Sequence, residues 1–451
     1  MEVSGSIAPE IGNLDSLITL DLSGNQLDGS VAPSIFNLTV IESIHLYDNS
    51  LSGSLPRDIC RHNGLQKLKV LDLSRNELKG DIPSSLDQCP QLQTIRLRDN
   101  NFSGHVPKEI GNITQLKELD LSINSLTGVI PEKIFHLDNL QKLGMSTNEL
   151  SGFLPAFGNM KALEDLTLRG NDLTGPIPFS IENLSNIKSI DISYNKLNGA
   201  IPSTIGNLSN LQEISLAYNN LNGFIPQEIH NLHQLSSLSM SSNNLSGPLP
   251  PSIFNISSLE YISLGNNKLS GALPSEIGNM KAIKALFLYN NSFVGPISPT
   301  IGNLSTLVIL FLSFNYLNGP IPSTIGNLAN LEDLNLLSNE LNGTIPSSIG
   351  NLQYVFRLRL TFNKLNGLIP SSIGNLSEMS ILSLSSNKFY GELPSSMCNL
   401  TLLEQLILSN NSLAGSIPVC FENMSKSLKT TYLGMHLRVL CVKGISRISK
   451  Q

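Results

Sequence analysis

Residues 17–29 read LITLDLSGNQLDG, and this pattern, L-x-x-L-x-L-x-x-N-x-L-x-G, decides the fold. Its Asn recurs seventeen times between Asn25 and Asn411, and a Gly always follows four residues later. The spacing is 24 residues, apart from one step of 27 and one of 23. Recurrence at a short fixed period is the signature of a solenoid, in which each unit stacks only on its neighbours.

Within one unit, apolar and polar residues alternate over the length of a short strand. In the unit around Leu166, this places Leu163, Leu166 and Leu168 inward and Asp165 and Thr167 outward. Gly suits a tight turn, and the Pro that follows it suits a turn or an edge. We therefore predict an α/β repeat solenoid, a right-handed superhelix or horseshoe. It would have a parallel β-sheet on its concave face and short 3-10 or helical turns on its convex face.

The recurring Asn is expected to bond backbone groups that the turn leaves unpaired inside a dry core. The pattern covers residues 1–425, with about 17–18 repeats that begin in the middle of a unit. Residues 426–451 are predicted to be a degraded last repeat and a basic tail without repeats. The tail would either bind an acidic partner or have no ordered structure.

Composition excludes several classes of function. The net charge of −6 argues against a nucleic-acid partner. No P-loop, H-E-x-x-H or G-x-S-x-G motif is present, so we predict that the chain is not an enzyme and needs no cofactor. His230 and His233 lack a third ligand, and no metal site is predicted.

The five Cys are an odd number in a long chain of 451 residues, so we do not predict a disulfide scaffold. Cys398 and Cys420 lie in adjacent turns and are the favoured disulfide pair. Cys60 and Cys89 also lie in neighbouring turns and are the second candidate pair. Buried free thiols are the alternative for both, and Cys441 is left over.

The full unit, L-x-x-L-x-L-x-x-N-x-L-x-G-x-I-P-x-x-I-G-N-L, resembles the plant-specific leucine-rich repeat. It is most similar to the ectodomains of plant leucine-rich-repeat receptor-like kinases and receptor-like proteins. The resemblance implies an extracellular glycoprotein that binds a peptide or protein on its concave face in signalling or defence, with a leucine-rich-repeat co-receptor kinase as a further partner. The chain as written shows no signal peptide, transmembrane segment or kinase domain, although the resemblance allows a kinase in the parent protein.

A second family has similar repeats. Secreted plant cell-wall proteins of the polygalacturonase-inhibitor type use this unit to inhibit a pathogen hydrolase, and they are the alternative function. Those proteins are usually about half as long, so the length of this chain favours the receptor.

Sequons of the form N-x-S/T agree with an extracellular origin, although N-L-S is also part of the repeat itself. The predicted glycosylation sites are Asn37, Asn101, Asn112, Asn183, Asn207, Asn244, Asn255, Asn290, Asn303, Asn342, Asn375, Asn399, Asn410 and Asn423. Asn327 and Asn351 occupy the same place in the repeat but lack the sequon, which predicts a sugar-poor stretch of outer face.

The outward positions of the strands are not needed for packing and are the natural binding surface. Most carry Ser, Thr or Asp, but the units between about residues 259 and 363 carry aromatic, apolar and Arg residues. The predicted ligand-binding residues are Tyr261, Phe287, Tyr289, Ile309, Phe311, Phe314, Leu337, Arg357, Arg359 and Phe362. Apolar residues rimmed by cations indicate a ligand site. Packing of the rings on one another along the sheet is the alternative.

Arg357 and Arg359 lie on one strand, with both side chains outward and about 7 Å apart. Guanidinium groups bind a carboxylate in a bidentate manner. The pair resembles the R-x-R motif with which some plant peptide receptors hold the free C-terminus of a peptide. Arg96 and Arg98 sit one step later in their strand and do not match that register.

Overall fold

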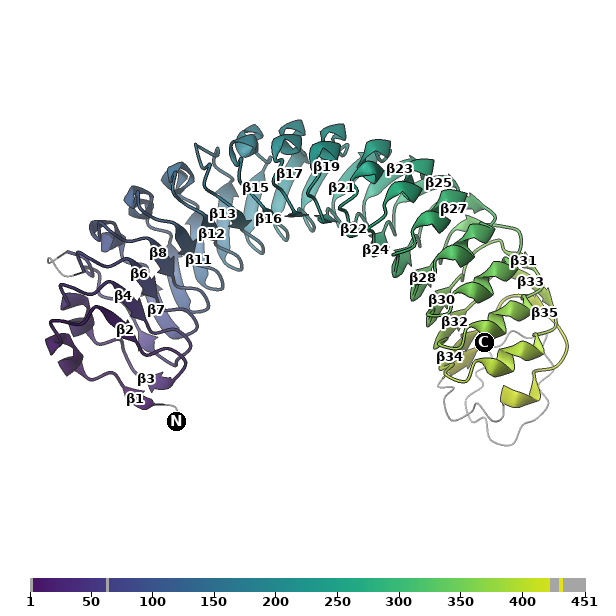
Figure 1. Ribbon diagram of the computed structural model, residues 1–451, viewed down its shortest axis with the longest axis horizontal. Coiled ribbons are helices and arrows are strands. Elements are labelled where there is room, and N and C mark those ends of the chain that lie inside the picture. Colours follow the sequence, from purple (N-terminus) through teal and green to yellow (C-terminus); the bar gives the residue numbers. More distant parts are fainter. Residues whose placement is uncertain (1–2, 62–64, 422–429, 433–451) are drawn as a thin grey trace. The chain divides into compact units, whose positions relative to one another are not determined.

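The computed structural model describes residues 3–61, 65–421 and 430–432. The chain packs as two compact units, Met1–Asn222 and Gly223–Gln451. Within each unit the repeats contribute a short strand to a first sheet, usually a second short strand on the flank, and in most repeats a 3-10 helix on the opposite side (Figure 1). The predicted solenoid of parallel strands and 3-10 turns is confirmed.

The strands of the first sheet follow one another in sequence order and pair in parallel within each unit. In unit 1 they are β2 (Thr19–Asp21), β4 (Ser43–His45), β6 (Val70–Asp72), β8 (Thr94–Arg96), β10 (Glu118–Asp120), β12 (Lys142–Gly144), β14 (Asp165–Thr167), β16 (Ser189–Asp191) and β18 (Glu213–Ser215). In unit 2 they are β20 (Ser237–Ser239), β22 (Tyr261–Ser263), β24 (Ala285–Phe287), β26 (Ile309–Phe311), β28 (Asp333–Asn335), β30 (Arg357–Arg359), β32 (Ile381–Ser383), β34 (Gln405–Ile407) and β36 (Thr430–Tyr432).

The flanking strands were not part of the sequence-based prediction. They contain the residues that follow the recurring Asn, and they also pair in parallel. Those that begin in unit 1 are β1 (Ser4–Ser6), β3 (Gln26–Asp28), β5 (Ser52–Gly53), β7 (Glu77–Asp81), β9 (Asn101–His105), β11 (Ser125–Val129), β13 (Glu149–Phe153), β15 (Asp172–Gly175), β17 (Lys196–Ala200) and β19 (Asn220–Gly223). Those in unit 2 are β21 (Asn244–Gly247), β23 (Lys268–Ala272), β25 (Ser292–Pro296), β27 (Tyr316–Gly319), β29 (Glu340–Leu341), β31 (Asn366–Gly367), β33 (Lys388–Gly391) and β35 (Ser412–Leu413).

The 3-10 helices contain the I-G-N part of the repeat, and most begin after a Pro such as Pro202 at their N-cap. In unit 1 they are η1 (Pro9–Asn13), η2 (Pro33–Asn37), η3 (Ser84–Gln88), η4 (Lys108–Asn112), η5 (Glu132–His136), η6 (Phe179–Asn183) and η7 (Ser203–Asn207). In unit 2 they are η8 (Gln227–Asn231), η9 (Pro251–Asn255), η10 (Ser275–Asn279), η11 (Pro299–Asn303), η12 (Ser323–Asn327), η13 (Ser347–Asn351), η14 (Ser371–Asn375) and η15 (Ser395–Asn399).

The leucines of the repeat form the core. Leu166 is buried, and it pairs in register with Leu143 and Ile190 on the neighbouring strands. Leu163 and Leu168 are buried as well, as the alternation predicts. Repetition therefore stacks apolar side chains of similar size in continuous rows, and the outward side chains stay free for other roles.

The recurring Asn connects successive repeats. Asn195 Nδ2 donates to the carbonyl oxygens of Leu168 (3.0 Å), Ile192 (3.2 Å) and Ser193 (3.1 Å). Its Oδ1 accepts a hydrogen bond from the backbone N–H of Leu173 (3.0 Å). Because the side chain is buried, these bonds satisfy backbone groups that water does not reach. The predicted role of this Asn is confirmed.

The recurring Gly is required both by its backbone angle and by the close approach of the preceding repeat. Gly175 has a φ of +77°, a conformation that side chains with a Cβ rarely adopt. A Cβ at Gly175 would also meet the ring of Phe153 from the preceding repeat. The turn therefore needs Gly both for its backbone angle and for the close approach of its neighbour.

Two disulfides join adjacent repeats. Cys398 is bonded to Cys420 in unit 2, and Cys60 is bonded to Cys89 in unit 1. The sequence favoured the first pair and named the second as a candidate. Cys441 and most of residues 426–451, including the boundary predicted near residue 425, lie outside the described residues. Within that segment Thr430–Tyr432 pairs with β34, so the degraded last repeat still adds a strand.

We expect replacement of both Cys398 and Cys420 by serine to lower the free energy of unfolding by about 3 kcal/mol, because the bond closes a loop of 22 residues. Urea unfolding followed by circular dichroism measures the loss. The variant lacks the Cys398–Cys420 bond, so reductant should not lower the stability of unit 2 any further. An unchanged unfolding free energy would show that the bond does not constrain the unfolded chain.

Candidate functional site

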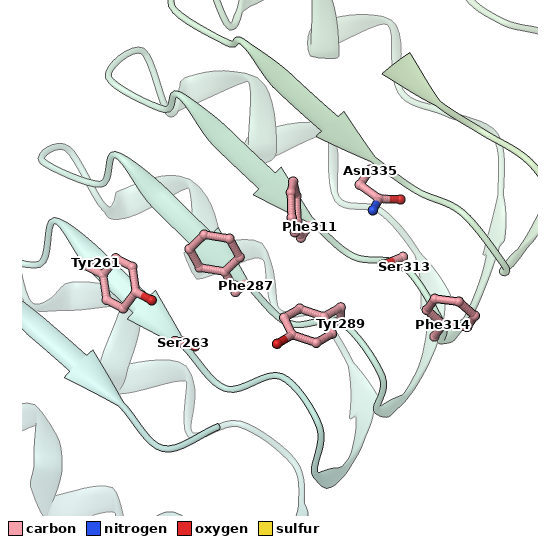
Figure 2. A pocket seen from close by; sticks show the side chains of 8 residues that line it. All are labelled: Tyr261, Ser263, Phe287, Tyr289, Phe311, Ser313, Phe314 and Asn335. Carbon is pink, nitrogen blue, oxygen red and sulfur yellow. The ribbon is translucent and has the colours of Figure 1, made fainter. Parts of the chain in front are cut away.

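Five of the six aromatic residues predicted to bind ligand converge on one face of the first sheet in unit 2. They surround an open hollow of about 390 Å³ on strands β22 to β28 (Figure 2). The hollow is lined by Tyr261, Ser263, Phe287, Tyr289, Phe311, Ser313, Phe314 and Asn335. Five of these residues belong to the predicted set. Ser263, Ser313 and Asn335 do not.

Strand register explains this convergence. Ser263, Phe287, Phe311 and Asn335 occupy the same outward position on four successive strands, so their side chains form one row across the sheet. Tyr289 and Phe314 come from the loops that follow β24 and β26. The repeat therefore converts residues 24 positions apart into neighbours about 4.8 Å apart.

The rings also pack on one another, so the alternative interpretation of the sequence holds in part. The ring centroids of Tyr261 and Phe287 are 5.5 Å apart, and those of Phe287 and Phe311 are 5.2 Å apart in an edge-to-face arrangement. Tyr261 and Phe314 are nevertheless exposed, with 38% and 53% of their surface accessible. Ring packing therefore holds the walls of the hollow in place, and the hollow remains open to solvent.

Besides the arginine pair, three of the predicted residues lie apart from the hollow. Ile309 is half-buried on β26, in the outward row that also holds Asp333. Leu337 is half-buried in the loop after β28, and Phe362 is exposed in the loop after β30. None of them lines the hollow. Phe362 adopts a φ of +54° at the position before the recurring Asn, where the turn requires a positive φ in most repeats.

Arg357 and Arg359 project from β30 toward a carboxylate that the sequence-based prediction did not single out. Arg357 Nε lies 2.7 Å from Asp333 Oδ2, and Arg359 Nη1 lies 3.1 Å from Asp333 Oδ1. The Asp333 side chain is only 1% exposed, whereas the two Arg side chains are 36% and 24% exposed. The carboxylate therefore lies beneath the two guanidinium groups, and their outer sides face solvent.

The contacts of the two arginines differ in kind. Arg359 Nη1 donates hydrogen bonds to both oxygens of Asp333. The Arg357 Nε–H is not directed at the carboxylate, so that contact is an ion pair without a hydrogen bond. The Arg357 guanidinium lies over the ring of Phe356, 4.5 Å from its centroid. Two positive charges share one negative charge, and the cluster retains a net charge of +1.

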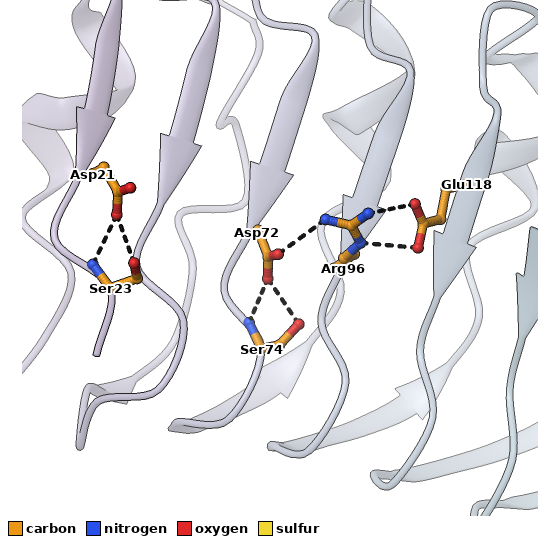
Figure 3. A network of polar contacts seen from close by, with 6 residues as sticks. All are labelled: Asp21, Ser23, Asp72, Ser74, Arg96 and Glu118. Atoms are coloured by element: carbon orange, nitrogen blue, oxygen red, sulfur yellow. Dashed lines mark hydrogen bonds and ion pairs between the residues drawn. The ribbon is translucent and has the colours of Figure 1, made fainter. Parts of the chain in front are cut away.

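Burial raises the pKa of Asp333, and the nearby Arg359 and Arg357 oppose that rise only in part. The opposite holds at Asp21 in unit 1, where the pKa is lowered because the carboxylate accepts hydrogen bonds from the hydroxyl and the backbone N–H of Ser23 (Figure 3). The two aspartates therefore contribute to stability with opposite signs.

This difference predicts opposite effects of two matched substitutions. The raised pKa means that stability falls as pH rises from the ordinary value of 3.8 through the folded pKa of Asp333. Asp333→Asn is thus expected to be no less stable than the parent at pH 7. The lowered pKa of Asp21 gives stability that is present above 3.8 and lost as pH falls through the folded pKa, so Asp21→Asn should lose stability at pH 7.

Urea midpoints of both variants between pH 3 and pH 7 test the pair. Each difference from the parent should shrink toward the acid end, as the carboxyl groups take up protons, and Asp21 should do so at lower pH than Asp333. A marked loss of stability in Asp333→Asn at neutral pH would show that the arginines outweigh the burial of this carboxylate.

Arg96 in unit 1 provides a contrast, because its guanidinium group donates hydrogen bonds to two carboxylates. Arg96 donates to Glu118 through Nε (2.8 Å) and Nη2 (2.5 Å), and it donates to Asp72 through Nη1 (3.3 Å) (Figure 3). Asp72 also accepts from Ser74. Here one positive charge meets two negative charges, so the network has a net charge of −1 and no excess positive charge with which to hold an anionic ligand.

The sequon asparagines are accessible. All thirteen that the structure describes are exposed, and eight of them end a 3-10 helix. Asn423 lies outside the described residues. Asn327 and Asn351 end η12 and η13 without a sequon. Glycosylation stays a prediction that these positions sterically allow.

The described residues show neither a metal-binding cluster nor a membrane-spanning helix. In that part of the chain, no three His, Cys, Asp or Glu side chains gather closely enough to hold a metal ion. The same residues contain no helix with the length and apolar character of a membrane span.

Two leucine-rich-repeat family models match most of this solenoid. One matches residues 62–102, 114–173 and 185–245. The other matches residues 16–38, 258–280, 306–328, 330–352, 355–376, 379–400 and 402–424. The chain belongs to the leucine-rich-repeat family. A search of curated protein sequences finds no match for this leucine-rich-repeat chain.

Solved structures of plant receptors resemble this leucine-rich-repeat protein over nearly its whole length. The plant peptide hormone receptor RGFR1 in complex with RGF2 is 35% identical, with a TM-score of 0.87, and the match covers 95% of this chain and 72% of RGFR1. The Arabidopsis receptor kinase HAESA, in complex with the peptide hormone IDA and the co-receptor SERK1, is 34% identical, with a TM-score of 0.89 and coverage of 97% and 73%.

A third similar structure is the leucine-rich-repeat ectodomain of the membrane receptor kinase GASSHO1/SCHENGEN3 from Arabidopsis thaliana, in complex with CASPARIAN STRIP INTEGRITY FACTOR 2. It is 37% identical, with a TM-score of 0.84, and the match covers 97% of this chain and 55% of that one. The leucine-rich-repeat protein described here therefore resembles plant receptor-kinase ectodomains in fold and in sequence.

Proposed function

We propose that this chain is the ligand-recognition module of a plant cell-surface receptor and that it binds a peptide on the first-sheet face of unit 2. Similarity to three receptor ectodomains solved with peptide ligands supports this class of ligand. A co-receptor kinase is a second expected partner, since HAESA is solved with SERK1. The exposed sequons agree with a location on the outer face of the cell.

The observation that carries the proposal is the charge of the arginine cluster. Asp333 neutralises only one of the two guanidinium groups, and it does so from the buried side. A carboxylate approaching from solvent would meet the outer N–H groups of both arginines. Charge-assisted hydrogen bonds of this kind are roughly twice as strong as neutral ones. The free C-terminus of a peptide supplies such a carboxylate.

A neutral C-terminus would lose these interactions. The experiment presents the full chain with a random heptapeptide library in two forms, one with free C-terminal carboxylates and one with C-terminal amides. The proposal expects enrichment of specific sequences from the free-acid library, and at least about tenfold weaker binding when a selected peptide is amidated. Equal binding of acid and amide forms, or no selected sequence at all, would overturn it.

A further inference from the structure

The arginine cluster and the aromatic hollow lie on one continuous sheet face of unit 2. Arg359 continues the outward row that contains Phe287, Phe311 and Asn335, and each of these residues is one strand from the next. The centre of the hollow lies between β24 and β26, which is two to three strands from β30. At about 4.8 Å per strand, the separation between cluster and hollow is roughly 10–14 Å.

This separation determines which residue of a bound peptide would reach the hollow. An extended peptide advances about 3.3–3.6 Å per residue. If its terminal carboxylate meets Arg357 and Arg359, the chain can run across the sheet toward β22, because the hollow lies on that side. A distance of roughly 12 Å then corresponds to about the fourth residue from the C-terminus.

The surface between cluster and hollow fits a peptide backbone. Asn335 lines the edge of the hollow, one strand from Arg359, and its Oδ1 accepts a hydrogen bond from the backbone N–H of Leu337 (3.2 Å). That bond orients the amide and leaves Nδ2 to donate. Among the described residues no partner is seen for this Nδ2. A carbonyl oxygen of a crossing peptide is the matching acceptor.

The hollow itself fits a large apolar side chain. Its walls are mainly the rings of Tyr261, Phe287, Tyr289, Phe311 and Phe314, with Ser263, Ser313 and Asn335 as its polar lining. Its volume of about 390 Å³ lies near the lower end of the range of ~300–1,000 Å³ for small-molecule sites. It therefore holds one large side chain with part of its backbone.

We infer that the ligand is a peptide whose fourth residue from a free C-terminus is large and apolar, and that this side chain occupies the hollow while Arg357 and Arg359 hold the carboxylate. The inference rests on the proposed function and adds the position and the chemical class of a second specificity determinant. The third and fifth residues mark the limits of the spacing.

A positional scan of peptides tests the inference. Starting from the tightest free-acid heptapeptide selected from the library, each of its last six positions is changed in turn to Ala, Phe, Leu and Asp, and the affinity for the full chain is measured by fluorescence polarisation. Phe or Leu should exceed Ala by about tenfold or more at the fourth position from the C-terminus, and Asp should weaken binding there.

Two protein variants separate the two determinants. Phe287→Ala with Phe311→Ala should remove the preference at the fourth position and keep the preference for the free acid over the amide. Tyr194→Ala with Tyr218→Ala removes a stacked, exposed ring pair in unit 1 and should change neither preference. Thermal unfolding of each variant checks that the fold is retained.

The outcomes distinguish the inference from the proposal beneath it. Peptides that need a free carboxylate but show their apolar preference outside the third to fifth positions from the C-terminus, or at none, would overturn the inference and leave the proposed function intact. A persistent preference at the fourth position in the Phe287 and Phe311 variant would also overturn it. Loss of any difference between acid and amide peptides would overturn the proposed function itself.

Discussion

Replacing Asn195 by alanine is expected to lower the free energy of unfolding by about 3–5 kcal/mol, because one side chain makes four hydrogen bonds inside a dry core. The substitution leaves the N–H of Leu173 without its partner, and a buried unsatisfied group costs about 1–3 kcal/mol. The carbonyl of Leu168 loses one of two donors and still accepts from Asn171 Nδ2. Urea unfolding measured by circular dichroism gives the difference.

Asn198 on β17 offers a matched control three residues away. Its side chain is exposed, so Asn198→Ala should change the free energy of unfolding by less than about 0.5 kcal/mol. Since Asn195 belongs to unit 1, peptide binding by the folded variant should stay at the parent value. A loss below about 1 kcal/mol in Asn195→Ala would mean that the Asn rows contribute little to stacking.

The second large effect is expected at the arginine cluster. Arg357→Ala combined with Arg359→Ala should weaken the binding of a free-acid peptide by about 100-fold or more, because charge-assisted hydrogen bonds contribute about 1.5–3 kcal/mol each. Isothermal titration with the full chain measures the affinity. The double variant also leaves Asp333 buried without its partners, so its fold must be checked by thermal unfolding.

Asp333→Asn is the companion variant for this measurement. It keeps an oxygen that can accept from Arg359 and raises the net charge of the cluster from +1 to +2. The free-acid peptide should therefore bind at least as tightly as it binds the parent. Weaker binding would show that the position of the arginines depends on the charge of Asp333, and that the excess charge is not what attracts the ligand.

The repeat could be predicted from the sequence because its physics is local. Leu163, Leu166 and Leu168 alternate with polar residues, and the recurrence of Asn and Gly at one spacing leaves a parallel solenoid as the consistent outcome. The flanking strands were missed. They contain few side chains that alternate in and out, and they form because the neighbouring repeat brings an equivalent backbone segment alongside.

The candidate site could be predicted only in part. Phe287 and Phe311 differ from the Ser and Asp of other units, so their positions stand out in the repeat. Asp333 was missed because an outward Asp is common in this chain. A signal was available, since Asp333 precedes Arg357 by one repeat of 24 residues. The same spacing gives the ion pairs Asp72–Arg96 and Glu164–Lys188.

The residue types of the remaining lining residues do not identify the site. Ser263 and Asn335 line the hollow because of their place in the register, and their residue types carry no distinctive signal. Ile309 and Leu337 are as apolar as the lining residues, yet they do not line the hollow. Strand register decides which outward residues meet, and the register becomes informative once the repeats are aligned as strands.

The coupling between the ligand carboxylate and the arginine pair tests the central claim most directly. Four affinities are measured by titration, with acid and amide forms of one peptide against the parent chain and against the Arg357→Ala, Arg359→Ala variant. The account predicts that amidation weakens binding to the parent by tenfold or more and leaves binding to the variant unchanged. If amidation weakens binding to the variant by the same factor as to the parent, the carboxylate binds elsewhere and the account is wrong.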